Sequence, residues 1–109
     1  MPFFRVLFLS DAVDYIETPE RDVREKVIYT IEKASYTRDP RLFKKLNSAI
    51  WEFRIRHLNN QYRLLAFWDK RDPRNTYVVV ATGLIKKRAS IPLNALQKAR
   101  MLQQRYFEN

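Results

Sequence analysis

The sequence predicts an α+β fold whose elements follow the order β-α-α-β-β-β-α. Residues 51–68 alternate between apolar and charged side chains, which is the two-residue period of a β-hairpin. Residues 23–34 and 93–106 instead repeat apolar side chains every three or four positions, which is the period of an amphipathic helix. Residues 76–84 are rich in β-branched side chains and predict a further strand.

The chain has 109 residues, so we expect one domain over residues 1–109 with a single core. Cysteine is absent, which excludes disulfides and a cysteine nucleophile and suits a reducing cytoplasm. His57 is the only histidine, and the acidic residues form no convergent set, so no metal site is expected. The single glycine, Gly83, excludes the phosphate-binding and dinucleotide-binding loops. We therefore expect no cofactor.

The formal net charge of +9 indicates an anionic partner. Nucleic acid is the commonest partner for such a chain. A membrane is less favoured, because the apolar run near the N-terminus is too short for a span and lacks the features of a signal peptide. An acidic protein stays open, since composition does not separate it from RNA or DNA.

The first third of the chain predicts a strand followed by two helices. Residues 3–9 are apolar on both faces except at Arg5, which suits a strand well inside a sheet. A short helix is expected over residues 11–17. The Thr-Pro-Glu sequence at residues 18–20 then has the capping hydroxyl and first-turn proline of a second helix, which should run to about Ser35. Its buried side is formed by Val23, Val27, Ile28, Ile31 and Ala34.

The hairpin over residues 51–68 is expected to turn at Asn59-Asn60, because asparagine tolerates the positive φ of a tight turn. Residues whose numbers sum to 119 then lie opposite one another, and Trp51 faces Trp68. Both indoles should be buried on the face that the helices cover. Removing either one is expected to cost about 3 to 5 kcal/mol.

The other face of the hairpin gathers three arginines, with Arg54 beside Arg56 and Arg56 opposite Arg63. Like charges across a ladder are destabilising, so this arrangement indicates an anion that normally lies there. Each arginine alone would fit a solvated strand position. Together they are interpreted as functional, and replacing one with alanine is expected to spare folding.

Basic residues also flank the predicted strands. Lys44 and Lys45 lie in the segment 41–47 that leads into the hairpin, where a lysine pair is more often only solvated surface. A polar turn over residues 69–75 precedes the strand at 76–84. A basic triplet, Lys86-Lys87-Arg88, follows that strand. After Pro92 a last helix is expected, with an apolar face formed by Leu93, Leu96, Ala99, Leu102 and Tyr106.

Five short motifs resemble the RelE/ParE superfamily of bacterial toxins, and most closely its HigB-like branch, which is often described as phage-derived. They are FKKL at 43–46, IWEFRI at 50–55, QYRLL at 61–65, GLIKK at 83–87 and Pro92. The order and spacing of the set span nearly the whole chain. The resemblance implies an antiparallel sheet with a helical hairpin on one face and a concave basic surface on the other.

Members of this type are ribonucleases that cut mRNA, commonly in the ribosomal A site. The resemblance puts Arg63 on the arginine of the Tyr-Arg motif and Arg54 and Arg56 on positions that contact RNA phosphates. It puts Lys86 or Lys87 on the basic position after the last strand. The expected catalytic set is Arg63, Lys86, Lys87 and Arg54, and the expected RNA-binding set is Arg54, Arg56, Lys44, Lys45 and Arg88. The resemblance also implies an inhibitory antitoxin, usually a HigA-like helix-turn-helix protein.

Proton transfer has to be assigned within this chain. Relatives carry a tyrosine, or histidines and an acid, near the C-terminus, whereas Ile91-Pro92 and a tail without histidine stand here. Attack of a ribose 2′-hydroxyl needs a proton acceptor, and arginine stays protonated. Lys86 and Lys87 are preferred, because crowded positive charge depresses the pKa of a lysine. Glu52 is expected to pair with an arginine, and His57 is expected to be structural.

Two alternatives stay open at this point. A ParE-like inhibitor of DNA gyrase would use the same fold without a catalytic constellation. A basic nucleic-acid-binding module without activity would leave the growth of cells that express it unaffected. The sequence alone does not separate these from a ribosome-dependent endoribonuclease.

Overall fold

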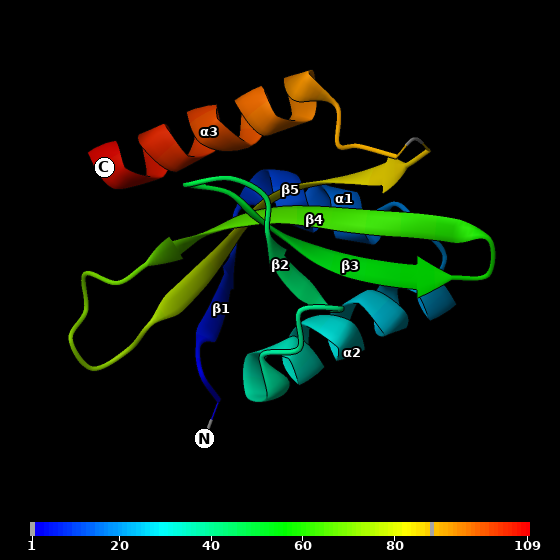
Figure 1. The fold of residues 1–109 in the computed structure, drawn as a ribbon, viewed down its shortest axis with the longest axis horizontal. Helices are drawn as coiled ribbons and strands as arrows, with labels where there is room; N and C mark the ends of the chain where they lie inside the picture. The colour runs from blue at the N-terminus through cyan, green and yellow to red at the C-terminus, as the bar shows by residue number, and fades with distance from the viewer. Residues whose placement is uncertain (1, 88) are drawn as a thin grey trace.

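The computed structural model describes residues 2–87 and 89–109 and contains a five-stranded sheet between two layers of helix (Figure 1). The elements in chain order are β1 (Arg5–Phe8), α1 (Ser10–Glu17), α2 (Arg21–Thr37), β2 (Phe43–Lys45), β3 (Trp51–His57), β4 (Asn60–Asp69), β5 (Tyr77–Lys86) and α3 (Leu93–Glu108). The mixed α+β fold predicted from the sequence is confirmed. The strand β2 was not predicted, because only three residues pair there.

The strands are arranged in the order β1-β5-β4-β3-β2. The pairs β5–β4, β4–β3 and β3–β2 are antiparallel, whereas β1 runs parallel to β5. The prediction of a first strand well inside the sheet was wrong, because β1 is an edge strand and Leu7 and Phe8 are partly exposed. Within β1, Val6 is partly buried and the other three residues are exposed.

Helices α1 and α2 cover one face of the sheet, and α3 lies across the other face (Figure 1). The core under α2 joins Val27 and Ile31 to Phe53, Leu64 and Val80. A second core under α3 joins Ala99 to the opposite faces of β4 and β5, at Leu65, Phe67, Val79 and Ala81. Since α3 packs on this part of the sheet, only the hairpin end of that face is left open.

The hairpin register differs from the predicted one by two residues. Observed partners sum to 117, so that Trp51 lies opposite Ala66 and Arg54 opposite Arg63. The turn is at Leu58-Asn59, and Leu58 takes the left-handed conformation with φ 55°. A shift of two residues keeps every side chain on its predicted face, which is why the apolar pattern cannot distinguish the two registers.

The two tryptophans are neighbours even in this register. Their ring centroids are 5.6 Å apart in an edge-to-face arrangement on the helix-covered side. Phe43 of β2 stacks on Trp51 at 4.9 Å. Each indole packs against the core and is of intermediate exposure, so both are mostly buried but neither is fully buried.

Helix α1 is held to β5 at the single glycine. A Cβ atom at Gly83 would collide with the ring of Tyr15, and the Tyr15 hydroxyl donates to the Leu84 carbonyl at 2.8 Å. Burial and the neighbouring Tyr62 hydroxyl raise the pKa of Tyr15. In the described ranges, no helix has the length and apolar character that crossing a membrane requires.

Candidate nucleic-acid interface

An arginine-rich depression occupies the open end of the sheet face that α3 partly covers. In Figure 1 the β3–β4 turn extends past α3, and the depression lies on these two strands. It has a volume of about 400 Å³. The lining residues are Arg41, Arg54, Arg56, Gln61 and Arg63. Four guanidinium groups around one open hollow suit an anionic ligand such as a phosphate.

Glu52 lies buried between two of these arginines, at 4% exposure. Its Oε1 is 3.5 Å from Arg54 Nε, and its Oε2 is 3.5 Å from Arg63 Nε. These distances are too long for good hydrogen bonds. The contacts are ion pairs, and the negative charge of Glu52 offsets the repulsion between Arg54 and Arg63, which are directly opposite in the ladder. The pairing of Glu52 with arginine agrees with the expectation from the sequence.

Arg63 forms the floor of the depression and is only 3% exposed. Its NH2 group donates to Gln61 Oε1 at 2.7 Å, and its NH1 group donates to the Tyr62 carbonyl at 3.2 Å. Burial, together with the charges of Arg54 and Arg56, lowers the pKa of Arg63, although arginine remains a cation at ordinary pH. These contacts hold its guanidinium plane in one orientation.

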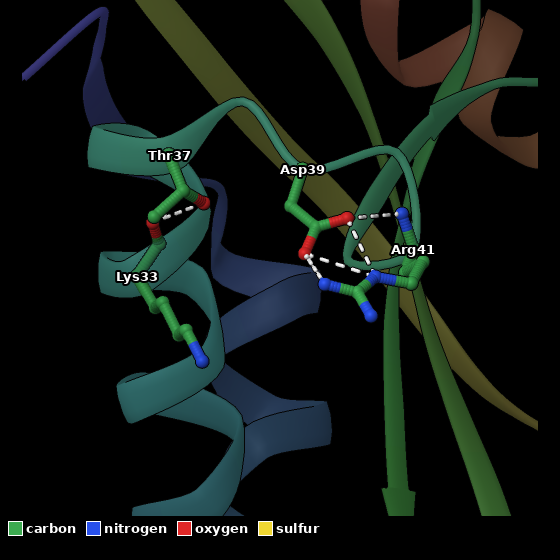
Figure 2. Close-up of polar contacts among 4 residues, drawn as sticks. All are labelled: Lys33, Thr37, Asp39 and Arg41. Carbon is green, nitrogen blue, oxygen red and sulfur yellow. Dashed lines mark hydrogen bonds and ion pairs between the residues drawn. The ribbon is translucent and has the colours of Figure 1, made fainter.

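Arg41 lies at the rim of the depression, although the sequence did not predict it as a site residue. It lies between α2 and β2, and Figure 2 shows its guanidinium beside the carboxylate of Asp39. The NH2 group of Arg41 is 2.8 Å from Asp39 Oδ2, and its backbone N–H donates to Oδ1 at 2.9 Å. These hydrogen bonds lower the pKa of Asp39. The spacing of Asp39 and Arg41 around Pro40 is the one local signal of this turn, but their position beside β3 depends on the tertiary fold.

The predicted lysines are dispersed around the sheet. Lys44 pairs with Glu52 on the arginine side, whereas Lys45 pairs with Trp51 on the helix-covered side. Lys86 pairs with Gln61 at the end of β5, and Lys87 follows it as an exposed residue. Neither of these two lines the depression. Arg88, which was expected to bind RNA, lies outside the described residues.

His57 is on the helix-covered side and does not approach the arginines. Its Nε2 atom is 3.0 Å from Asp22 Oδ2, so that it links the hairpin end to the start of α2. This contact fits the expected structural role. Among the described residues, no group of three His, Cys, Asp or Glu side chains converges as metal ligands would.

Residues 14–104 match the family described as Phage derived protein Gp49-like (DUF891). The chain belongs to this family. The Gp49-like proteins are a RelE/ParE-like toxin family, so the superfamily predicted from the five motifs is confirmed. Among curated proteins, none matches this Gp49-like chain.

The fold also agrees with a solved toxin structure. The archaeal RelE–RelB complex from Pyrococcus horikoshii OT3 matches with a TM-score of 0.54 and 13% identity. The match covers 80% of the Gp49-like chain and 99% of the other chain. At this identity the likeness concerns the fold, and it confirms a RelE-like arrangement of sheet and helices.

Proposed function

We propose that this protein is the toxin of a type II toxin–antitoxin system and cuts mRNA as an endoribonuclease during translation. The observation that carries the proposal is the arginine-lined depression with Arg63 fixed in its floor. Membership of a RelE/ParE-like toxin family and a net charge of +9 support it.

Cleavage would proceed by attack of a ribose 2′-oxygen on the adjacent phosphorus. That oxygen gives up its proton, the bond from phosphorus to the 5′-oxygen breaks, and the leaving oxygen takes up a proton. The products are a 2′,3′-cyclic phosphate and a 5′-hydroxyl. Negative charge grows on the phosphorane, and fixed cations at that point lower the barrier.

The arginines would divide this work according to their burial. Arg63 is held by Gln61 and the Tyr62 carbonyl, so it offers a preorganised charge beneath the phosphorane. Arg54 is partly buried beside Glu52 and would support the same charge. Arg56 and Arg41 are exposed and would bind the flanking phosphates. Lys44 would extend this surface along β2.

Lys86 and Lys87 remain the proposed groups for proton transfer. Lys86 is opposite Gln61, which itself lines the depression, so a substrate that extends across β4 onto β5 would approach it. Glu52 is less suited to exchange protons with solvent, because it is buried between two guanidinium groups. Replacing each lysine singly with methionine separates them: the one that transfers the proton should alter the pH dependence of cleavage.

The proposed partners are mRNA, the ribosome and an antitoxin, and the proposed site of action is the cytoplasm. The similar solved structure is that of a RelE–RelB complex. For the Gp49-like chain we propose a HigA-like helix-turn-helix antitoxin encoded beside it. Co-expression with the adjacent reading frame should relieve toxicity, and the two proteins should co-purify. If no neighbouring product binds, this part of the proposal fails.

The experiment is to map transcript ends after brief induction of the wild-type protein and of Arg56→Ala. Arg74→Ala is the matched control, since Arg74 is exposed in the β4–β5 loop and forms none of the ion pairs found in the described chain. New ends within coding regions should appear with the wild-type protein and the control and should be lost with Arg56→Ala. Intact transcripts together with gyrase stalled on plasmid DNA would instead favour a ParE-like inhibitor.

A further inference from the structure

A second cavity lies on the helix-covered side of the hairpin, away from the arginines. Its volume is about 430 Å³, within the range of ligand-binding pockets. Its lining residues include two tyrosines, Tyr15 and Tyr62, and two acidic residues, Glu20 and Asp22. Lys and Arg make up 21 of the 109 residues, yet neither type is found among the described residues that line this cavity. Aromatic faces and carboxylates are the groups that bind an organic cation.

Tyr62 provides a polar group that the fold itself does not use. The residue is only 6% exposed and lines the cavity, and its hydroxyl has no hydrogen-bond partner among the described residues. Tyr15, by contrast, donates its hydroxyl to the Leu84 carbonyl. The Tyr62 hydroxyl is not among the buried atoms that lack a partner, so it is accessible from the cavity and can form a hydrogen bond with a ligand there.

The two carboxylates differ in how far they are already engaged. Asp22 accepts a hydrogen bond from the Val23 backbone N–H at 2.9 Å and contacts His57 at 3.0 Å. Its charge therefore serves partly to stabilise the start of α2. Glu20 forms no side-chain hydrogen bond or ion pair with the described residues and is exposed at the cavity. Glu20 is thus the carboxylate that remains for a ligand.

The rim of the cavity is apolar. Leu58 is 81% exposed and takes a positive φ, a conformation that leucine adopts only with strain. Ile85 is 44% exposed on the neighbouring strand. The two-residue hairpin turn at Leu58-Asn59 requires a positive φ, and it leaves the leucine side chain exposed at the rim. The rim offers apolar contact to a chain that reaches into the cavity.

We propose that this cavity receives a lysine or arginine side chain of a partner protein, whose apolar neighbours pack on Leu58 and Ile85. The cationic group would lie against the Tyr15 and Tyr62 rings, donate to the Tyr62 hydroxyl oxygen and pair with Glu20. The surface is acidic and apolar, so it complements a basic segment, whereas the arginine depression complements an anion. The inference does not depend on ribonuclease activity, because it concerns the other face of the sheet.

The test uses the tripeptide N-acetyl-Leu-Arg-Leu-amide, with citrulline in place of arginine as the neutral counterpart. Titration of the ¹⁵N-labelled protein should give saturable chemical-shift changes at Glu20, Leu58 and Tyr62, and the citrulline peptide should bind at least tenfold more weakly. Arginine amide alone should also bind more weakly, because it lacks the apolar neighbours. Equal affinity for the two tripeptides, or for arginine amide, would overturn the proposal.

Two variants locate the binding. Tyr62→Phe keeps the ring but removes the hydroxyl, and Glu20→Gln removes an exposed charge; each should weaken tripeptide binding several-fold. Glu32→Gln is the matched control on the exposed surface of α2 and should bind as the wild type does. If Tyr62→Phe does not fold, Glu20→Gln decides the outcome. Unchanged binding by a folded Glu20→Gln protein, or equal loss in Glu32→Gln, would contradict the proposal. Cleavage of mRNA is measured separately and should be unaffected by Glu20→Gln.

Discussion

Replacing Arg63 with alanine should destabilise the protein as well as abolish its toxicity. Arg63 is almost fully buried, and its Nε is 3.5 Å from the buried carboxylate of Glu52. Its loss would leave Glu52 with only Arg54 at that distance. Breaking a buried ion pair from one side commonly costs about 3 to 5 kcal/mol. With separations longer than hydrogen bonds, we expect the lower end, about 3 kcal/mol.

The assay is urea unfolding together with thermal unfolding of Arg63→Ala beside Arg56→Ala, with Arg74→Ala as the control. For a domain of this size, a loss of about 3 kcal/mol lowers Tm by roughly 10 to 20 °C. Arg56 is exposed, so its replacement should change the free energy of unfolding by no more than about 0.5 kcal/mol. An Arg63→Ala protein as stable as Arg56→Ala would refute the structural role given to the buried arginine.

Three further predictions concern other parts of the molecule. Arg56→Ala should reduce the slope of log affinity against log salt for single-stranded RNA by about 0.7 if Arg56 binds one phosphate, and an unchanged slope would remove it from the interface. Gly83→Ala should lower the free energy of unfolding by about 1 to 3 kcal/mol, because the new Cβ atom forces the Tyr15 ring away. In urea unfolding the same change should cost less when it is made in a Tyr15→Ala protein, where the ring is absent. Hydrogen bonds, first from Arg71 and then from Tyr106, hold the pKa of Asp69 well below its ordinary value of 3.8. The ionised carboxylate therefore stabilises the fold at pH values above 3.8, and this stabilisation is lost as the pH falls below 3.8. Asp69→Asn should therefore flatten the decline in stability between about pH 5 and 2, and an equal decline in both proteins would exclude this source.

Much of the fold follows from local patterns. The helical spacing of Val23, Val27 and Ile31 is sufficient to predict α2 and most of its buried side, although Ile28, which was also expected there, is 44% exposed. The alternation in β3 and β4 is sufficient to predict which side chains share a face. The register of the β3–β4 hairpin could not be predicted in this way. Asn59 and Asn60 favour a turn at their own positions, whereas the packed strands turn at Leu58-Asn59. A shift of two residues leaves the polarity pattern unchanged, so only long-range pairing decides it.

The sequence predicted that three arginines share one face of the hairpin, but it did not predict that one of them is buried. Arg54, Arg56 and Arg63 share a face in either register, which made their association predictable. The burial of Arg63 was not, because exposure trends for arginine predict a solvated side chain. Arg41 joins them through the return of the chain beside β3, where Arg54 N donates to the Leu42 carbonyl at 2.8 Å. No pattern within the segment 38–43 encodes that contact.

The most direct test of the central claim is the chemistry of the RNA ends made in a purified translation reaction. Wild-type protein, freed of any antitoxin, should cut the mRNA and leave a 2′,3′-cyclic phosphate on one fragment and a 5′-hydroxyl on the other. Arg54→Ala and Arg56→Ala, each shown to be folded, should leave the mRNA intact, while Arg74→Ala should cut it as the wild type does. Uncut mRNA with the wild-type protein, or equal cutting by all four proteins, would contradict the assignment of the arginine depression as a ribonuclease site.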